Sequence, residues 1–307
     1  MVVFRGLSDP RLLPRPSAVA VGNFDGLHCG HRRLLERLCA RAGAAGLRSL
    51  VLTFEPHPER ALGRRSVRLI DTPAQRLDRL RATGIDAVVL VPFGRPFARL
   101  SCREFVEDVL RGRLGAREVV VGRGFRFGRG RRGDVDLLRR LGREAGLAVQ
   151  AVAPAVLGGR VVSSTAVRAL LARGGVEEAA RLLGRPYEIA GRVVPGRKRG
   201  RLLGYPTANL DTANELLPEG IYISETLKGQ TAHPSVTSIG TNPTFGPNPL
   251  TVETLLLDFR GSLYGAGITV RLLRRLRRPR AFPGAEALSA AIARDIAAAE
   301  DWFARRG

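Results

Sequence analysis

The chain has 307 residues, of which 44% are hydrophobic and 25% charged, so it has the size of a two-domain protein and the composition of a folded one. It contains no apolar run of about 18 residues and its first residues lack the apolar core of a secretory signal, which excludes a membrane-spanning protein and predicts a cytoplasmic location. The formal net charge of +22 invites a nucleic-acid interpretation, but the arginines are spread along the chain and not clustered with aromatic residues, which favours a basic surface suited to polyphosphate substrates.

The first half of the chain alternates short apolar runs with amphipathic segments. Short runs that end at glycine, proline or polar residues predict buried strands, and apolar residues recurring on one face predict helices. This alternation predicts a parallel α/β sheet with right-handed crossovers, in which ligands bind beyond the carboxyl ends of the strands. The predicted strands are 18–22, 49–54, 87–92, 118–122 and 148–153, and the predicted helices are 31–45, 72–83, 101–110, 163–173 and 176–183.

The pattern changes after Pro186. Strand-like segments now follow one another, separated by turn residues and with little helix between them, as in a small antiparallel barrel. The predicted strands are 187–194, 220–225, 235–239, 251–259 and 268–273, and a terminal helix is predicted from the apolar spacing of Leu288, Ile292, Ile296, Ala299 and Phe303. We therefore predict two domains, residues 1–185 and residues 186–307.

The first predicted strand leads directly into Gly22-Asn23-Phe24-Asp25-Gly26-Leu27-His28-Cys29-Gly30-His31, which opens the first helix. Backbone N–H groups and the positive end of the helix dipole face outward at such a turn, which suits an anion. Gly30 permits the close approach of a phosphate, and His28 and His31 can donate hydrogen bonds to its oxygens. Two alternatives stay open: a histidine pair that only caps or packs, and a metal site, for which His57 and His233 offer no obvious third ligand.

A second group of phosphate-binding residues is predicted at the start of a later helix. Ser163, Ser164 and Thr165 bring hydroxyls to the helix N-terminus, and Arg168 can clamp a phosphate with two hydrogen bonds. A plain helix cap with a surface arginine explains the same residues.

The second predicted domain carries a glycine-rich basic loop. Gly196 and Gly200 permit a tight turn, and Arg197, Lys198 and Arg201 supply positive charge for a phosphate. Mg²⁺ prefers a few protein oxygens and completes its shell with phosphates and water, and Thr207 and Asn209, two residues apart on an extended segment, can furnish two of them. A basic hairpin with a Pro-Thr turn is the alternative.

These motifs resemble those of the prokaryotic bifunctional riboflavin kinase/FMN adenylyltransferases, also called FAD synthetases. Residues 22–31 resemble the family's G-N-F-D-G-x-H-x-G-H, residues 53–58 its T-F-x-P-H-P, residues 163–168 its S-S-T-x-I-R, and residues 191–210 the riboflavin kinase motif that ends in P-T-A-N-L. Further matches lie at residues 97–105, 122–128, 220–222, 238–246 and 252–265. The resemblance implies a Rossmann-like nucleotidylyltransferase domain followed by a riboflavin-kinase-like antiparallel β-barrel with a terminal helix.

The resemblance also implies the reactions and the residues. The C-terminal domain would transfer the γ-phosphate of ATP to riboflavin, with Mg²⁺ on Thr207 and Asn209 and with Glu253 as general base, and the N-terminal domain would adenylylate the product FMN to FAD, releasing pyrophosphate. The catalytic residues are then Glu253, His28, His31 and Arg168. ATP and phosphate binding falls to Gly22, Asn23, Phe24, Asp25, Gly30, Ser163, Ser164, Thr165, Gly196, Arg197, Lys198, Gly200 and Arg201, and flavin binding to Pro56, His57, Phe125, Arg126 and Arg277.

Two positions depart from the family pattern. Gly124 stands where the family carries Asp or Asn, and Leu255 where it usually carries histidine. The first departure leaves open a riboflavin kinase with weak or absent adenylyltransferase activity, and a basic nucleic-acid-binding protein is the alternative from another class. The expected partners are the small molecules riboflavin, FMN and ATP, without a membrane or a nucleic acid, and no oligomeric state is predicted.

Overall fold

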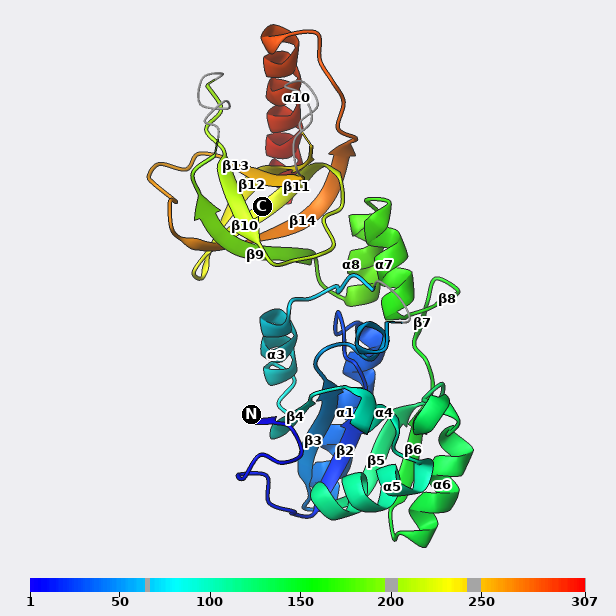
Figure 1. Ribbon diagram of the computed structural model, residues 1–307. Helices are drawn as coiled ribbons and strands as arrows, with labels where there is room; N and C mark the ends of the chain where they lie inside the picture. Colours follow the sequence, from blue (N-terminus) through cyan, green and yellow to red (C-terminus); the bar gives the residue numbers. More distant parts are fainter. Residues whose placement is uncertain (64–66, 197–203, 242–249, 307) are drawn as a thin grey trace. The chain divides into compact units, whose positions relative to one another are not determined.

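The computed structural model describes residues 1–63, 67–196, 204–241 and 250–306, which form two compact units, Met1–Ser163 and Ser164–Gly307 (Figure 1). The predicted phosphate-binding residues Arg197, Lys198, Gly200 and Arg201 lie outside the described residues, as does the segment 242–249. Within the described ranges, no helix combines the length and the apolar character that crossing a bilayer requires.

The first unit is built on a six-stranded sheet with every pairing parallel, in the order β1-β4-β3-β2-β5-β6, which confirms the predicted α/β class (Figure 1). Alternate residues of β2 enter two cores: Val19 and Val21 pack with the helical segments η1 and α6, and Ala18 and Ala20 with α1 and α3. Both faces of the sheet are therefore covered. The strands are β1 Val2–Arg5, β2 Ser17–Val21, β3 Arg48–Phe54, β4 Ala87–Val91, β5 Ala116–Gly122 and β6 Ala148–Val152, and the helices are α1 Cys29–Ala44, α2 Pro58–Ala61, α3 Pro73–Arg81, α4 Arg95–Ala98, α5 Cys102–Glu104, the π-helix η1 Phe105–Arg113, the 3₁₀ turn η2 Arg129–Arg131 and α6 Val135–Glu144.

The strand order places a switch point between β2 and β5. From β2 the chain runs through β3 to β4 on one side of the sheet, and it later adds β5 and β6 on the other side. Ligands of such sheets bind where the order reverses, beyond the carboxyl ends of the strands. The segments that follow β2 and β5 are those that carry the predicted histidine pair and the predicted residues Phe125 and Arg126.

Several elements of the first unit differ from the prediction. The edge strand β1 was missed because it is only four residues long and pairs with β4 alone. The helix predicted at 101–110 starts at the expected Ser101 cap but continues as the π-helix η1 to Arg113. The helix α6 and a hairpin of β7 Val156–Leu157 and β8 Arg160–Val161 were also missed.

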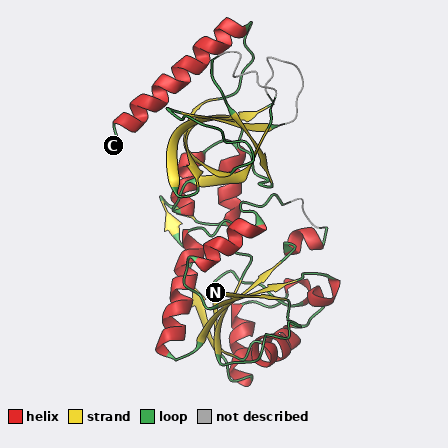
Figure 2. Cartoon of the chain, turned by 90° about the vertical axis from the view of Figure 1, so that its left-hand side faces the viewer, coloured by secondary structure: helices red, strands yellow, loops and turns green. Residues whose placement is uncertain are grey.

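The second unit contains a closed barrel in the order β10-β13-β12-β11-β14-β9, all antiparallel, which confirms the predicted barrel (Figure 2). The terminal helix α10 packs on the outward face of β11 and β12, where Ala299 joins Ile221, Ile223 and Val236 in one apolar cluster. The strands are β9 Tyr187–Val194, β10 Ala208–Thr212, β11 Gly220–Lys228, β12 Thr231–Gly240, β13 Thr251–Leu256 and β14 Gly267–Arg277, and the helices are α7 Ser164–Ala172, α8 Val176–Leu183 and α10 Ala285–Ala304.

The barrel interior contains a closed ring of hydroxyl groups. Five fully buried side chains each bond to two others of the set, with oxygen–oxygen distances from 2.7 to 3.2 Å. Because each hydroxyl can donate one hydrogen bond and accept another, the ring buries these groups without leaving any unpaired. In ring order the residues are Ser224, Ser235, Thr226, Thr254 and Thr237.

Helices α7 and α8 belong to the same compact unit as the barrel. Helix α8 packs on β9 and β14 and ends at Gly184, whose left-handed φ of 64° agrees with the predicted stop. The change of chain pattern at Pro186 therefore lies inside the second unit.

Candidate functional site

The loop after β2 has an unusual backbone. Phe24, Gly26 and Leu27 all have positive φ, of 51°, 80° and 33°. Gly26 also has no room for a side chain, since a Cβ would lie 2.8 Å from Cδ1 of Ile70. Non-glycine residues in this region are strained, and such residues cluster at functional sites. The Phe24 ring is buried in the core, so this predicted phosphate-binding residue offers a ligand only its backbone.

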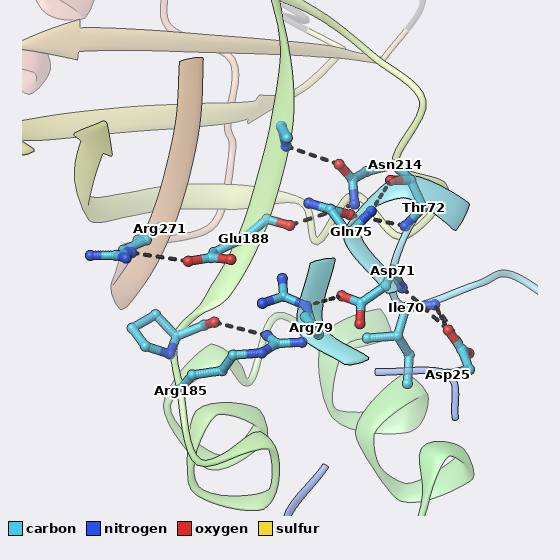
Figure 3. Close-up of polar contacts among 12 residues, drawn as sticks. Asp25, Ile70, Asp71, Thr72, Gln75, Arg79, Arg185, Glu188, Asn214 and Arg271 are labelled. Atoms are coloured by element: carbon cyan, nitrogen blue, oxygen red, sulfur yellow. Dashed lines mark hydrogen bonds and ion pairs between the residues drawn. The ribbon is translucent and has the colours of Figure 1, made fainter. Parts of the chain in front are cut away.

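Asp25 holds this loop in place. Its carboxylate is 2% exposed and accepts hydrogen bonds from the backbone N–H groups of Ile70 at 3.0 Å and Asp71 at 3.3 Å (Figure 3). Asp71 in turn pairs with Arg79 of α3 at 3.0 Å. The contacts of Asp25 therefore shape the loop, and they occupy the carboxylate for which the sequence predicted a phosphate role.

The two predicted catalytic imidazoles lie face to face at the start of α1. The rings of His28 and His31 stack with centroids 3.7 Å apart and planes at 13°. His28 caps the helix, because its Nδ1 accepts a hydrogen bond from the N–H of His31 at 3.2 Å. A Cβ on Gly30 would lie 3.2 Å from the His28 ring, so the glycine between them makes space for this arrangement.

His31 has an unsatisfied ring nitrogen. Burial, and then the neighbouring His28, hold the pKa of His31 well below its ordinary value of 6.5, so the ring is neutral at pH 7. Its Nδ1 is buried and has no hydrogen-bond partner among the described residues. Buried polar atoms are nearly always paired, so this nitrogen needs a partner that the described residues do not supply, either a water or a ligand.

We expect the free energy of unfolding to fall as the pH drops below about 6.5. Unfolded His31 then binds a proton that the folded ring does not accept until the pH reaches its lower folded pKa, so stability is lost across that window. One such proton gives a slope of about 1.4 kcal/mol per pH unit. Urea unfolding of the wild type and of His31→Gln at several pH values checks this, and equal slopes for the two proteins would exclude His31 as the source.

A buried arginine joins the loops after β2 and β3. Arg76, on α3, is 4% exposed and donates to the carbonyl of Phe54 at 3.1 Å and to that of Asn23 at 3.4 Å. It also forms an ion pair with Glu55. Sequence reasoning missed Arg76, because its helix lies outside every motif and an arginine there suggests only a solvated face.

The same two loops bring together residues predicted for phosphate and for flavin. The side-chain amide of Asn23 lies 3.0 Å from Nε2 of His57. His57 is buried and caps the short helix α2 by accepting from the N–H of Glu59 at 3.3 Å, whereas its neighbour Pro56 is exposed. The predicted groups are therefore contiguous at the carboxyl edge of the sheet.

Phenylalanines line the carboxyl ends of β3, β4 and β5. Phe125 stacks on Phe127 with ring planes at 8° and centroids 5.7 Å apart, and Arg126 lies 3.6 Å from Asp134. The chain of ring contacts continues from Phe127 through Phe105 to the partly exposed Phe97 and Phe93, which were not predicted as site residues. Phe105 and Phe127 are buried in the core, whereas Phe93, Phe97 and Phe125 are partly exposed and form an apolar surface that suits a planar aromatic ligand.

Gly124, the departure from the family pattern, is exposed in the same segment. A Cβ there would meet no atom within 4 Å. The position can therefore accept a side chain.

The remaining nucleotide motif lies at the start of α7. Ser163 ends the first unit, and Ser164 begins α7 in the second. Thr165 is exposed, and Arg168 follows one turn along the helix, partly buried. The helix start is thus where the sequence predicted it.

The second unit brings together the three residues predicted for phosphoryl transfer. Asn209 on β10 is the register partner of Glu253 on β13, and Oγ1 of Thr207 lies 3.4 Å from Oε2 of Glu253. Residues 208, 210, 252 and 254 point into the barrel and are buried, so Thr207, Asn209 and Glu253 share its outward face. Thr251, which was not predicted, places its hydroxyl 3.5 Å from the other oxygen of Glu253.

The glycine-rich loop starts directly beside Asn209. A Cβ on Gly196 would overlap the Asn209 amide, so only glycine permits this approach. Hydroxyl, amide and carboxylate oxygens are the hard donors that Mg²⁺ accepts, and the set fits that ion.

A cavity of about 450 Å³, widely open to solvent, lies between Tyr205, which is two residues before Thr207, and the first half of α10. Its volume is in the range of small-molecule sites. The lining residues are Tyr205, Ala285, Glu286, Ser289, Ala290 and Ala293.

Arg277, predicted to contact flavin, is engaged in an ion pair. Its Nε and Nη2 donate to the carboxylate of Asp295 on α10 at 2.8 to 3.1 Å, and Asp295 is buried. The guanidinium also lies 5.4 Å from the ring centroid of Phe282. These contacts hold α10 against the end of β14.

Comparison with known proteins gives consistent matches. The FAD synthetase family model matches residues 11–166, and the riboflavin kinase model matches residues 183–303. A bifunctional riboflavin kinase/FMN adenylyltransferase of Pseudomonas fluorescens is 39% identical, with 97% of each chain covered, and that of Escherichia coli K12 is 38% identical, with 99% of this chain and 98% of that protein covered. A solved structure described as a macrolide-efflux protein from Streptococcus pneumoniae superposes with a TM-score of 0.89 at 28% identity, covering 98% of this chain and 100% of that one.

Proposed function

The chain belongs to the family of bifunctional riboflavin kinase/FMN adenylyltransferases, and from this premise we propose which of its residues carry each activity. It is a flavin-cofactor enzyme with two ATP-dependent steps, the phosphorylation of riboflavin to FMN and the adenylylation of FMN to FAD. We assign adenylyl transfer to residues 1–185 and phosphoryl transfer to residues 186–307. Because both steps consume ATP, we place the enzyme in the cytoplasm.

Phosphoryl transfer is assigned to the outward face of β10 and β13. The 5′-hydroxyl of riboflavin attacks the γ-phosphorus of ATP as the bond to ADP breaks, and Glu253 accepts the hydroxyl proton. Thr207 and Asn209 would hold Mg²⁺, which when bound neutralises charge on the ATP phosphates. The observation that supports this assignment is the 3.4 Å contact between Thr207 and Glu253, with Asn209 in register beside them.

The phosphates and the flavin of this reaction have separate places in the proposal. The loop from Gly196 through Arg197, Lys198, Gly200 and Arg201 would cradle the phosphates of ATP. The cavity between Tyr205 and α10 would take the flavin ring, because it opens two residues before Thr207 and has the volume of a small-molecule site. Arg277, through its pairing with Asp295, would hold the α10 wall of that cavity.

Adenylyl transfer is assigned to the loop after β2 and to the start of α7. The phosphate of FMN attacks the α-phosphorus of ATP and pyrophosphate leaves, so the enzyme needs no nucleophile of its own. His28, His31, Ser164 and Arg168 would stabilise the charge that builds up on the phosphates. The unpartnered Nδ1 of His31 at a strained loop supports this assignment.

The other predicted residues of this activity have supporting roles in the proposal. Phe24 and Asp25 would keep the shape of the loop after β2, and Pro56, His57, Phe125 and Arg126 would contact flavin beside the phenylalanine surface. ATP phosphates would be bound by Gly22, Asn23, Gly30, Ser163 and Thr165.

One assay tests for both activities. The protein is incubated with riboflavin and Mg-ATP, and riboflavin, FMN and FAD are separated by chromatography over time. FMN should appear first and FAD later, and added FMN should give FAD without riboflavin. Phosphorylation of riboflavin with no FAD from added FMN would instead establish the kinase with an inactive adenylyltransferase half.

Gly124 favours weakened adenylyl transfer as the second candidate, and the structure permits a direct test. We expect Gly124→Asn to fold, because its Cβ meets no atom within 4 Å, and to gain about 0.4–1 kcal/mol of stability from a less flexible unfolded chain. FAD formation from FMN should rise several-fold, with riboflavin phosphorylation in the same preparation as the internal control. An unchanged rate of FAD formation would show that Gly124 does not limit this activity.

A further inference from the structure

One arginine of the barrel ties down the turn that follows helix α7. Arg275, on β14, donates from Nη1 to the carbonyl of Arg173 at 2.8 Å and from Nη2 to the carbonyl of Glu219 at 3.1 Å. Arg173 follows the last residue of α7, and Glu219 precedes β11. A planar guanidinium can join two carbonyls in fixed geometry, which a flexible ammonium cannot do as well. Arg275 therefore fastens the end of α7 to the barrel.

The turn fits closely around this guanidinium. Gly174 has a φ of 78°, and a Cβ there would lie 2.6 Å from Nη1 of Arg275 and 3.0 Å from the hydroxyl of Tyr222. Tyr222 donates to the same Glu219 carbonyl at 3.1 Å, and burial raises the pKa of Tyr222 to about 12, so it stays a donor. A side chain at Gly174 would therefore displace the Arg275 guanidinium, and the positive φ also disfavours a larger residue there.

Helix α7 is the first element of the second unit, and the chain continues from it through the turn to α8. Val167, Leu170 and Leu171 of α7 are buried, and α7 packs on α8, which packs on β14 and β9. The same helix begins with Ser164 and Thr165 and carries Arg168. A helix assigned to adenylyl transfer therefore belongs to the compact unit of the kinase barrel.

We infer that Arg275 is a positioning residue for adenylyl transfer, although it lies on a strand of the kinase barrel. The inference rests on the proposed role of Ser164 and Arg168. By fixing the turn after α7, Arg275 sets the orientation of the helix that presents Arg168 to the phosphates of ATP. Among the described residues, its side-chain hydrogen bonds go to Arg173 and Glu219, and neither of these is assigned to phosphoryl transfer.

The test compares two variants that disrupt the contact between Arg275 and the turn after α7 with a control variant that leaves the contact intact. Arg275→Ala removes the guanidinium, and Gly174→Ala pushes it away with a Cβ. Arg274→Ala is the control, because Arg274 is the exposed neighbour on the same strand. FAD formation from added FMN, FMN formation from riboflavin and thermal unfolding are measured for the full chain. Both contact variants should raise the KM for ATP in adenylyl transfer about tenfold, the equivalent of one or two hydrogen bonds, with kcat and KM of the kinase unchanged. Arg274→Ala should change neither activity.

Two outcomes would overturn the inference. An unchanged KM for ATP in folded Arg275→Ala would show that the contact does not position α7, and an equal fall of both activities would show that Arg275 only stabilises the barrel. If Arg275→Ala does not fold, Arg275→Lys is used in its place, because lysine keeps the charge and one hydrogen bond. Its KM for ATP should lie between those of the wild type and Gly174→Ala. A wild-type KM would contradict the inference. Arg168→Ala separates this inference from the proposed function. If this variant keeps full adenylyl transfer, the assignment of α7 to that reaction is wrong. If Arg168→Ala loses adenylyl transfer and Arg275→Ala keeps it, only the positioning role of Arg275 is wrong.

Discussion

Glu253→Gln is expected to slow FMN formation by about 10²–10⁴-fold, the usual effect of removing a general base. The amide keeps the size of the carboxylate and can still meet Thr207 and Thr251, but it cannot accept the proton of the attacking hydroxyl. FAD formation from added FMN should continue at the wild-type rate, since that step needs no base on β13. The two rates are measured separately, with riboflavin or FMN as the starting flavin.

Glu300→Gln is a matched control for this substitution. Glu300 is exposed on α10, so the same loss of charge there should leave both rates unchanged. Equal loss of FMN and FAD formation in Glu253→Gln would contradict separate sites for the two reactions. A kinase rate close to wild type would remove Glu253 from the role of base.

His31→Ala is expected to have the opposite effect, slowing FAD formation by about 10²–10³-fold and sparing FMN formation. The substitution removes the unpartnered Nδ1 and also the ring that stacks on His28. His28 keeps its cap only if the backbone N–H of residue 31 stays in place, so thermal unfolding is measured beside the rates.

His233→Ala serves as the control for loss of an imidazole. His233 lies on β12, where its ring contacts Phe259 edge-on at 5.2 Å, and it is not among the residues assigned to either reaction. It should leave both rates unchanged. If His31→Ala retained the wild-type rate of FAD formation, the two stacked histidines would only cap or pack the helix, which is the alternative that the sequence left open.

The fold could be predicted where the chain follows a simple period. The apolar runs of β2 to β6 and the spacing of α10 gave their elements directly, and Gly184 marked the end of α8. β10 was not predicted as a strand, because its five residues are mostly polar and show no apolar run. It forms a strand because it pairs with β9 and β13. The π-helical course of η1 depends on tertiary packing, which periodicity does not encode.

The site could be predicted only where a motif names its residues. Thr207, Asn209 and Glu253 lie 46 positions apart at the extremes and meet because β10 and β13 are neighbours, which the motifs implied but did not show. Arg76, Thr251, Phe93 and Phe97 were not predicted as site residues, because they reach the sites through tertiary contacts that the sequence does not show. The net charge, the most conspicuous feature of the composition, did not identify the function.

The ring of hydroxyl groups inside the barrel restricts which substitutions these five positions can accept during evolution. Replacing one member by valine would remove one hydrogen bond from each of its two neighbours, at a cost of about 1–3 kcal/mol for every group left unsatisfied. Serine and threonine can replace each other within the ring. Sequences in which only some of the five residues have become apolar should be less stable than those with a complete ring or with a fully apolar interior. Descendants of this chain should therefore keep all five members or lose them together.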